Sequence, residues 1–285
     1  MRSTGLQTIG IINAAVQTVV RVASPWMGVL WMTALPLRLL QAYFVYQLSF
    51  LQEPQYYFYY LWKLAAMVFA AFILSLYGRA VFVRACYIAS DSARDSKLEP
   101  LKVPLSDLIP YVYSALMLEL FFYLALFTVV GALPFVLLGG VIAAASYGVG
   151  GPKLIQAIVA PYKLLFSWRS IVALLGLAAQ FAAGLSIALI NLYFLIYAVV
   201  ELVGPLLGSA LPRWETILKF HLVLGVFPLY PEQWLVRTLL LVGASIIIEP
   251  FWLAANVDLV QKLRARKSGE DLRLWFGDVK SEGAA

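Results

Sequence analysis

Long stretches of this chain carry almost no charge, and this feature constrains the fold more than any other. Over residues 108–147 and 170–200 the only ionised side chain is Glu119. Both stretches are mainly apolar and longer than about 20 residues, the length of helix that spans a bilayer core. The chain is 62% hydrophobic and 13% charged, whereas soluble domains carry about 25% charged residues. We therefore predict an all-α polytopic membrane protein, with residues 1–285 forming a single membrane domain.

The apolar runs predict six transmembrane helices in a bundle. They lie at about 26–46, 57–78, 108–130, 134–147, 170–200 and 234–258, with the second continuing helically to about 90 and a tail at 259–285. Trp26 and Trp31 are typical of a membrane interface at one end of the first span. Gly131 and Pro134 favour a hairpin within 108–147. The alternative is one kinked helix of about 60 Å, twice the thickness of the bilayer core.

The basic residues predict the orientation of these spans. The net charge is +6, and most Lys and Arg residues lie near 84–107, in 148–169 or in the run that begins at Lys262. Six spans with both termini in the cytoplasm place these groups on the cytoplasmic side, as the positive-inside rule requires. A single span across 108–147 would place the C-terminal basic run outside. Topology thus accounts for the positive charge, and we expect no nucleic-acid partner.

Two segments predict amphipathic helices that lie on the membrane surface. In residues 5–23, apolar side chains recur every three or four positions: Leu6, Ile9, Ile12, Val16, Val19 and Ala23. Asn13, Gln17 and Arg21 form the opposite face, and Ser24-Pro25 is expected to end the helix. Residues 153–168 show a similar pattern. An ordinary surface helix of a soluble fold is the alternative for 5–23, but a membrane run follows it immediately.

Four polar side chains at membrane depth form the candidate site. Arg38 in the first span and Glu119 in the third lie at similar depth, and Gln180 in the fifth is comparable. Glu249 lies nearer the cytoplasmic side, and the following Pro250 is expected to open the local backbone hydrogen bonding. A buried charge costs about 2.5–3.5 kcal/mol on insertion scales, which favours pairing of Arg38 with Glu119. Either the four residues line a substrate or proton pathway, or, as we favour, they form a structural ion pair with supporting hydrogen bonds.

The sequence contains no recognisable catalytic motif. It lacks the Gly-x-Ser-x-Gly nucleophile elbow and the His-Glu-x-x-His zinc motif. The single Cys86 and single His221 exclude an internal disulfide and disfavour a zinc site. We expect no enzymatic activity, no cofactor and no metal. The expected partners are membrane lipids and another membrane or cytoplasmic protein.

Three features carry a resemblance to a known family. They are the hairpin turn Ala132-Leu133-Pro134-Phe135, the surface helix from Ala157-Ile158 through Leu164 to Ser167 and Trp168, and the segment from Arg264 to Leu274 after the last span. Together with the order of spans, they resemble the six-helix bacterial membrane domain found fused to some glycerophosphodiester phosphodiesterases and in stand-alone membrane proteins. The metal-binding carboxylates and histidines of the phosphodiesterase domain have no counterpart here. The resemblance thus implies a six-helix fold in a bacterial inner membrane and supplies no catalytic residues.

Overall fold

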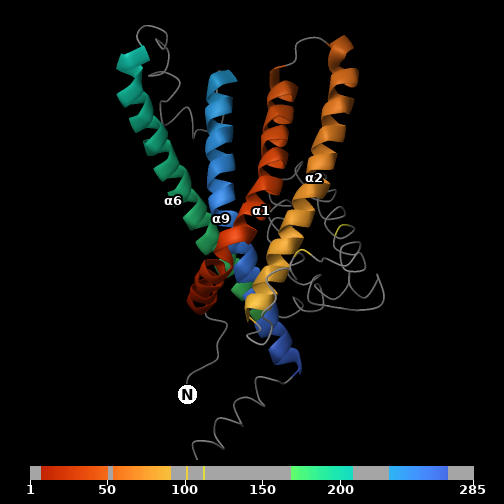
Figure 1. Ribbon diagram of the computed structural model, residues 1–285, viewed down its shortest axis with the longest axis vertical. Helices are drawn as coiled ribbons and strands as arrows, with labels where there is room; N and C mark the ends of the chain where they lie inside the picture. Colours follow the sequence, from red (N-terminus) through yellow and green to blue (C-terminus); the bar gives the residue numbers. More distant parts are fainter. Residues whose placement is uncertain are drawn as a thin grey trace, which may run out of the picture. The chain divides into compact units, whose positions relative to one another are not determined.

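The computed structural model describes residues 8–50, 54–90, 101, 112, 168–207 and 231–268. Within these ranges the chain is helical and contains no strand. The four long helices are α1 (Thr8–Phe50), α2 (Pro54–Ser90), α6 (Trp168–Leu207) and α9 (Pro231–Ser268) (Figure 1). The prediction of an all-α fold is confirmed for this part of the chain.

Three of these helices contain segments long and apolar enough to cross a membrane. The segments are Tyr60–Ala89 in α2, Ser170–Val203 in α6 and Val242–Ala265 in α9. The apolar stretches of α1, Ile9–Val22 and Trp26–Leu40, are shorter. The second, fifth and sixth predicted spans thus correspond to apolar helices of spanning length, which indicates a membrane protein.

The first predicted span, 26–46, falls in α1, whose apolar stretch Trp26–Leu40 is shorter than a span. The third and fourth, 108–130 and 134–147, lie outside the described residues, as does the surface helix 153–168 apart from Trp168. The six-span topology therefore stays a prediction.

Proline marks both the starts and the interiors of these helices. Pro54 and Pro231 are the first residues of α2 and α9, where the missing N–H costs nothing because no helical acceptor precedes it. However, α1 continues through Ser24 and Pro25, so the prediction that this pair ends a helix is wrong. A proline inside a helix removes one hydrogen bond and crowds the preceding turn. The long helical segments on both sides evidently outweigh that local cost.

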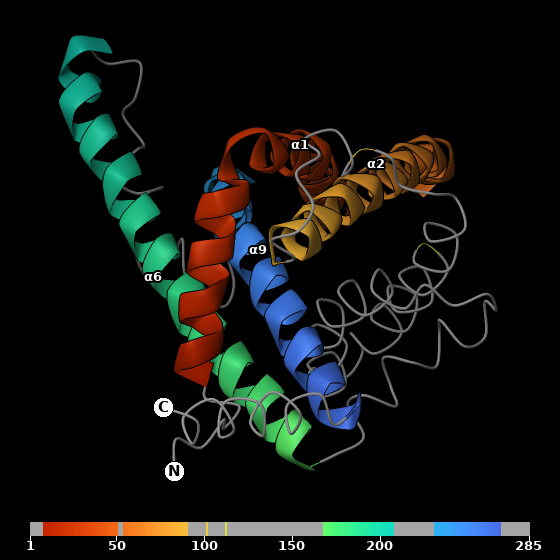
Figure 2. The same ribbon diagram turned by 60° about the horizontal axis from the view of Figure 1, so that its bottom comes forward.

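The chain divides into two compact units. Unit 1 comprises Met1–Gly28, Arg79–Gln180 and Pro250–Ala285, and unit 2 comprises Val29–Gly78 and Phe181–Glu249. Each of the four helices contributes one part to each unit. The helix α9, drawn in blue in Figure 2, contains Pro250 in its interior.

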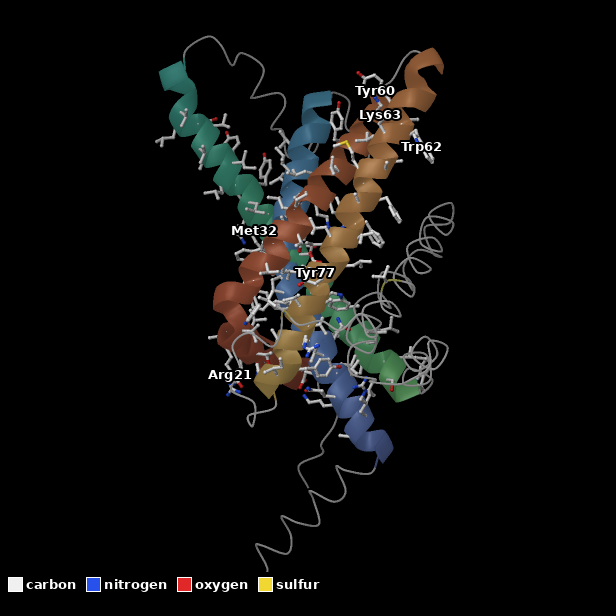
Figure 3. The ribbon with its side chains drawn as sticks, turned by 45° about the vertical axis from the view of Figure 1, so that its right-hand side comes forward. Arg21, Met32, Tyr60, Trp62, Lys63 and Tyr77 are labelled. Atoms are coloured by element: carbon white, nitrogen blue, oxygen red, sulfur yellow. The ribbon has the colours of Figure 1, made fainter. Side chains whose placement is uncertain are left out.

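The described core of unit 1 includes parts of α2 and α9 that are buried on all sides. Residues 80–83 of α2 and 253–257 of α9 are buried without interruption, a pattern typical of helices surrounded by protein. In α1 the buried face consists of Ile11, Ala15, Val19 and Val22. It is offset from the face that the sequence predicted, since Ile9 and Val16 are 67% and 42% exposed. The polar residues Asn13, Gln17 and Arg21 are exposed, as expected (Figure 3 shows Arg21).

Unit 2 contains a hydrophobic cluster between α6 and α9. Tyr193 of α6 packs with Val236 and Leu240 of α9, and partly buried residues of α6 surround them: Leu189, Leu192, Ile196 and Val200. Tyr193 also stacks on Tyr197, with ring centroids 6.3 Å apart. This cluster uses one side of α6 and leaves the other side exposed.

Candidate functional site

Three of the four predicted polar residues lie in the described helices, and each buries a polar atom. Arg38 Nε in α1 and Glu249 Oε2 in α9 are buried in unit 2, and Gln180 Oε1 in α6 is buried in unit 1. Polar groups in apolar helices of this kind are expensive in a bilayer and therefore need a structural or functional reason. Glu119 lies outside the described residues, so its pairing with Arg38 stays a prediction.

Arg38 and Glu249 lie at different levels along the helices of unit 2. Trp31 of α1 contacts α9 at Ile246, and within this unit the two helices run in opposite directions (Figure 1). Arg38 lies seven residues beyond Trp31, which is about 10 Å along α1. Glu249 lies three residues beyond Ile246, which is about 4.5 Å along α9. These displacements point in opposite directions and add to about 15 Å along the helix axes. The two residues therefore lie at different levels along the helix axes. The predicted position of Glu249 nearer the cytoplasmic side stays a prediction.

A backbone carbonyl of α9 accepts a hydrogen bond from a tryptophan of α1. Pro250 has no N–H, so it cannot donate to the carbonyl of Ile246, four residues earlier. Trp31 Nε1 donates to that carbonyl oxygen at 3.0 Å. The sequence predicted that Pro250 would open the local backbone bonding, and the bond from Trp31 shows how the freed acceptor is satisfied. Trp31 thus joins α1 to α9, in addition to the interfacial role that the sequence predicts for it.

Replacing Trp31 with Phe is expected to destabilise the protein by about 0.5–1.5 kcal/mol, the net value of one hydrogen bond. Lipid supplies no donor to the freed carbonyl, so the upper part of this range applies. Pro250→Ala restores an N–H to α9 and should reduce the effect of Trp31→Phe in the double variant. Thermal denaturation of the four proteins in one detergent measures this coupling. If Trp31→Phe lowers the stability equally in the wild-type and the Pro250→Ala backgrounds, Trp31 does not compensate for the missing N–H of Pro250.

Close contacts also join helices within unit 2. A Cβ atom added at the buried Gly78 of α2 would overlap Thr33 Oγ1 of α1 and lie 2.8 Å from Thr33 Cβ. Thr33 Oγ1 donates within its own helix, to Val29 O or to Leu30 O. At Gly184, which the sequence indicated as a close-packing position, an added Cβ would lie 3.7 Å from Ile248 Cδ1, an ordinary contact. Small residues commonly allow such approach of membrane helices.

Polar residues of α9 in unit 1 were not singled out from the sequence. Asn256 is fully buried, and its Nδ2 donates to Trp252 O at 2.7 Å. Further along α9, Lys262 Nζ and Asp258 Oδ2 form an ion pair at 2.7 Å. The i,i+4 spacing of Asp258 and Lys262 was a detectable signal for this pair. Among the described residues no group of three or more His, Cys, Asp and Glu side chains is placed to hold a metal ion.

Comparison with protein-family models, with curated proteins and with solved structures finds no match to this chain.

Proposed function

We propose that this chain is a non-catalytic integral membrane protein that organises lipids or holds a partner protein in a bacterial inner membrane. One observation carries the proposal. In the most apolar window of α6 only 6% of the residues are buried, compared with 50% in α2 and 53% in α9. Most residues of this apolar span are therefore half-buried or exposed, and the side of α6 that faces away from α9 is the exposed one.

The exposed side chains of α6 are large and apolar. Leu202 is 77% exposed, and Ile187, Leu195 and Phe194 are between 57% and 60% exposed. Water disfavours such a surface, at about 25 cal/mol per Å² of apolar area. Lipid or another protein therefore covers it. Met32 of α1 and Trp62 of α2 are also highly exposed (Figure 3), so contact with lipid extends to other helices.

The proposal includes six spans with both termini in the cytoplasm. The positive-inside distribution of Lys and Arg supports this topology. The resemblance to the membrane domain of glycerophosphodiester phosphodiesterases supports the bacterial inner membrane and the six-helix fold.

Purification in a gentle detergent tests this function. We expect a defined lipid or a specific protein to remain bound through gel filtration, in constant ratio to the chain. A lipid-free and partner-free monomer that transports a solute in proteoliposomes would overturn the proposal.

A transporter or lipid translocase is the second candidate, and the buried polar atoms of Arg38, Gln180 and Glu249 favour it. Such residues mark substrate and proton pathways in many membrane proteins. Proteoliposomes that contain fluorescent lipids separate the two candidates. Lipid movement between leaflets that requires the wild-type protein and is faster than in protein-free vesicles would support translocation. Lipid movement at the same rate as in protein-free vesicles would exclude a lipid translocase.

A further inference from the structure

The most exposed face of α6 carries an amide at membrane depth. Asn191 is exposed and lies within Ser170–Val203, about 7 Å from the middle of that segment by the helical rise. Its Nδ2 donates to Ile187 O at 2.9 Å. That bond uses one of the two N–H groups of the amide and neither lone pair of its oxygen. Hydrocarbon offers no partner for the second N–H or for the amide oxygen. Contact with lipid alone would therefore leave these groups of Asn191 without hydrogen bonds.

Asn191 lies at the centre of a face that points away from α9. At about 100° per residue, the residues within about 60° of it on the helix surface include the four most exposed large apolar residues of Ser170–Val203. They are Ile187, Phe194, Leu195 and Leu202. The cluster with α9, built around Tyr193, lies on the opposite side. Ile187, Asn191, Phe194 and Ala198 follow one another at spacings of four, three and four residues, which is the seam of a helix pair.

We propose that this Asn191 face is the interface between two copies of the chain. A membrane gives all copies the same orientation, so two copies related by a twofold axis along the membrane normal place α6 beside α6 in parallel. Identical residues near that axis then face each other. An Asn amide is complementary to itself, because each copy donates an N–H and accepts through its oxygen. Asn side chains that hydrogen-bond across helices stabilise association in membranes. This inference rests on the proposed function, because it uses the same exposed face of α6 and names a second copy of the chain as the partner protein.

Cysteine cross-linking in native membranes tests the interface. With Cys86 replaced by Ser, single cysteines are placed on the seam as Ile187→Cys, Phe194→Cys and Ala198→Cys. Ile190→Cys and Val199→Cys serve as matched controls, because they are exposed on the same helix about 100° and 80° from Asn191. We expect the seam variants to form disulfide-linked dimers upon oxidation, and the controls to form at least fivefold fewer. No dimers, or equal yields at all five positions, would overturn the proposal and indicate that another segment or another protein covers this face.

A second measurement tests the amide itself. Diluting labelled protein with lipid in proteoliposomes gives the dissociation constant of the dimer. Asn191→Leu should raise this constant about tenfold, whereas Asn191→Gln, which keeps the amide, should raise it less. An Asn191→Leu protein that dimerises as strongly as the wild type would show that the amide does not join the copies. Gel filtration of each variant confirms that it is folded.

Discussion

Arg38→Leu alone should destabilise the protein by about 3–5 kcal/mol if Arg38 pairs with Glu119 as the sequence predicts, because the variant removes one partner of a buried ion pair. A lone carboxyl group in lipid can take up a proton, which places the expected loss near the lower end of that range. Replacing both residues by Leu removes both charges, and such double replacements are often near neutral. The double variant should therefore be more stable than at least one of the single variants.

Thermal denaturation in one detergent measures the four stabilities of this cycle. Arg38→Lys is the matched control, since it keeps the charge and loses the planar guanidinium. The Nε atom of Arg38 is buried, and the residue as a whole is half-buried. Strictly additive losses from the two substitutions would show that Arg38 and Glu119 do not meet.

The second large effect is expected at Gly78. Gly78→Ala places a Cβ atom against Thr33 Oγ1 and Cβ, and overpacking of this kind typically costs about 1–3 kcal/mol. Gly78→Leu should cost more, because α1 and α2 must then separate. Thr33→Ala removes the atom nearest to the added Cβ, so Gly78→Ala with Thr33→Ala should be more stable than Gly78→Ala alone.

Gly28→Ala is the control for this prediction. A Cβ added there meets no atom within 4 Å, and Ala favours helix over Gly by about 1 kcal/mol. Gly28→Ala should therefore be neutral or stabilising in the same thermal denaturation assay. Equal melting temperatures for Gly78→Leu and the wild type would contradict the close approach of α1 and α2.

The apolar spans of α2, α6 and α9 could be predicted because they depend on composition alone. A stretch without charge is detectable in the sequence whatever surrounds it. The buried face of α1 was harder to predict, because apolar residues occupy two overlapping stripes. Ile9 and Val16 follow the helical period as well as Ile11 and Ala15 do. Tertiary packing chooses between the stripes, and local periodicity does not contain that information.

The interhelical contacts could be predicted only in part. Pro250 indicated that a carbonyl of α9 needed another donor, but that donor, Trp31, lies 215 residues away in the sequence. Gly78 has no local feature that distinguishes it from glycines such as Gly10, where an added Cβ meets nothing within 4 Å. Contacts of this kind depend on how helices far apart in the chain are brought together.

Native mass spectrometry of the protein, released from lipid nanodiscs formed directly from its own membrane, tests the proposed function most directly. We expect masses equal to whole copies of the chain plus a defined lipid or a specific protein, retained as the collision energy rises. Release of bare chains at the lowest energies, with neither lipid nor protein retained, would contradict a role in organising either.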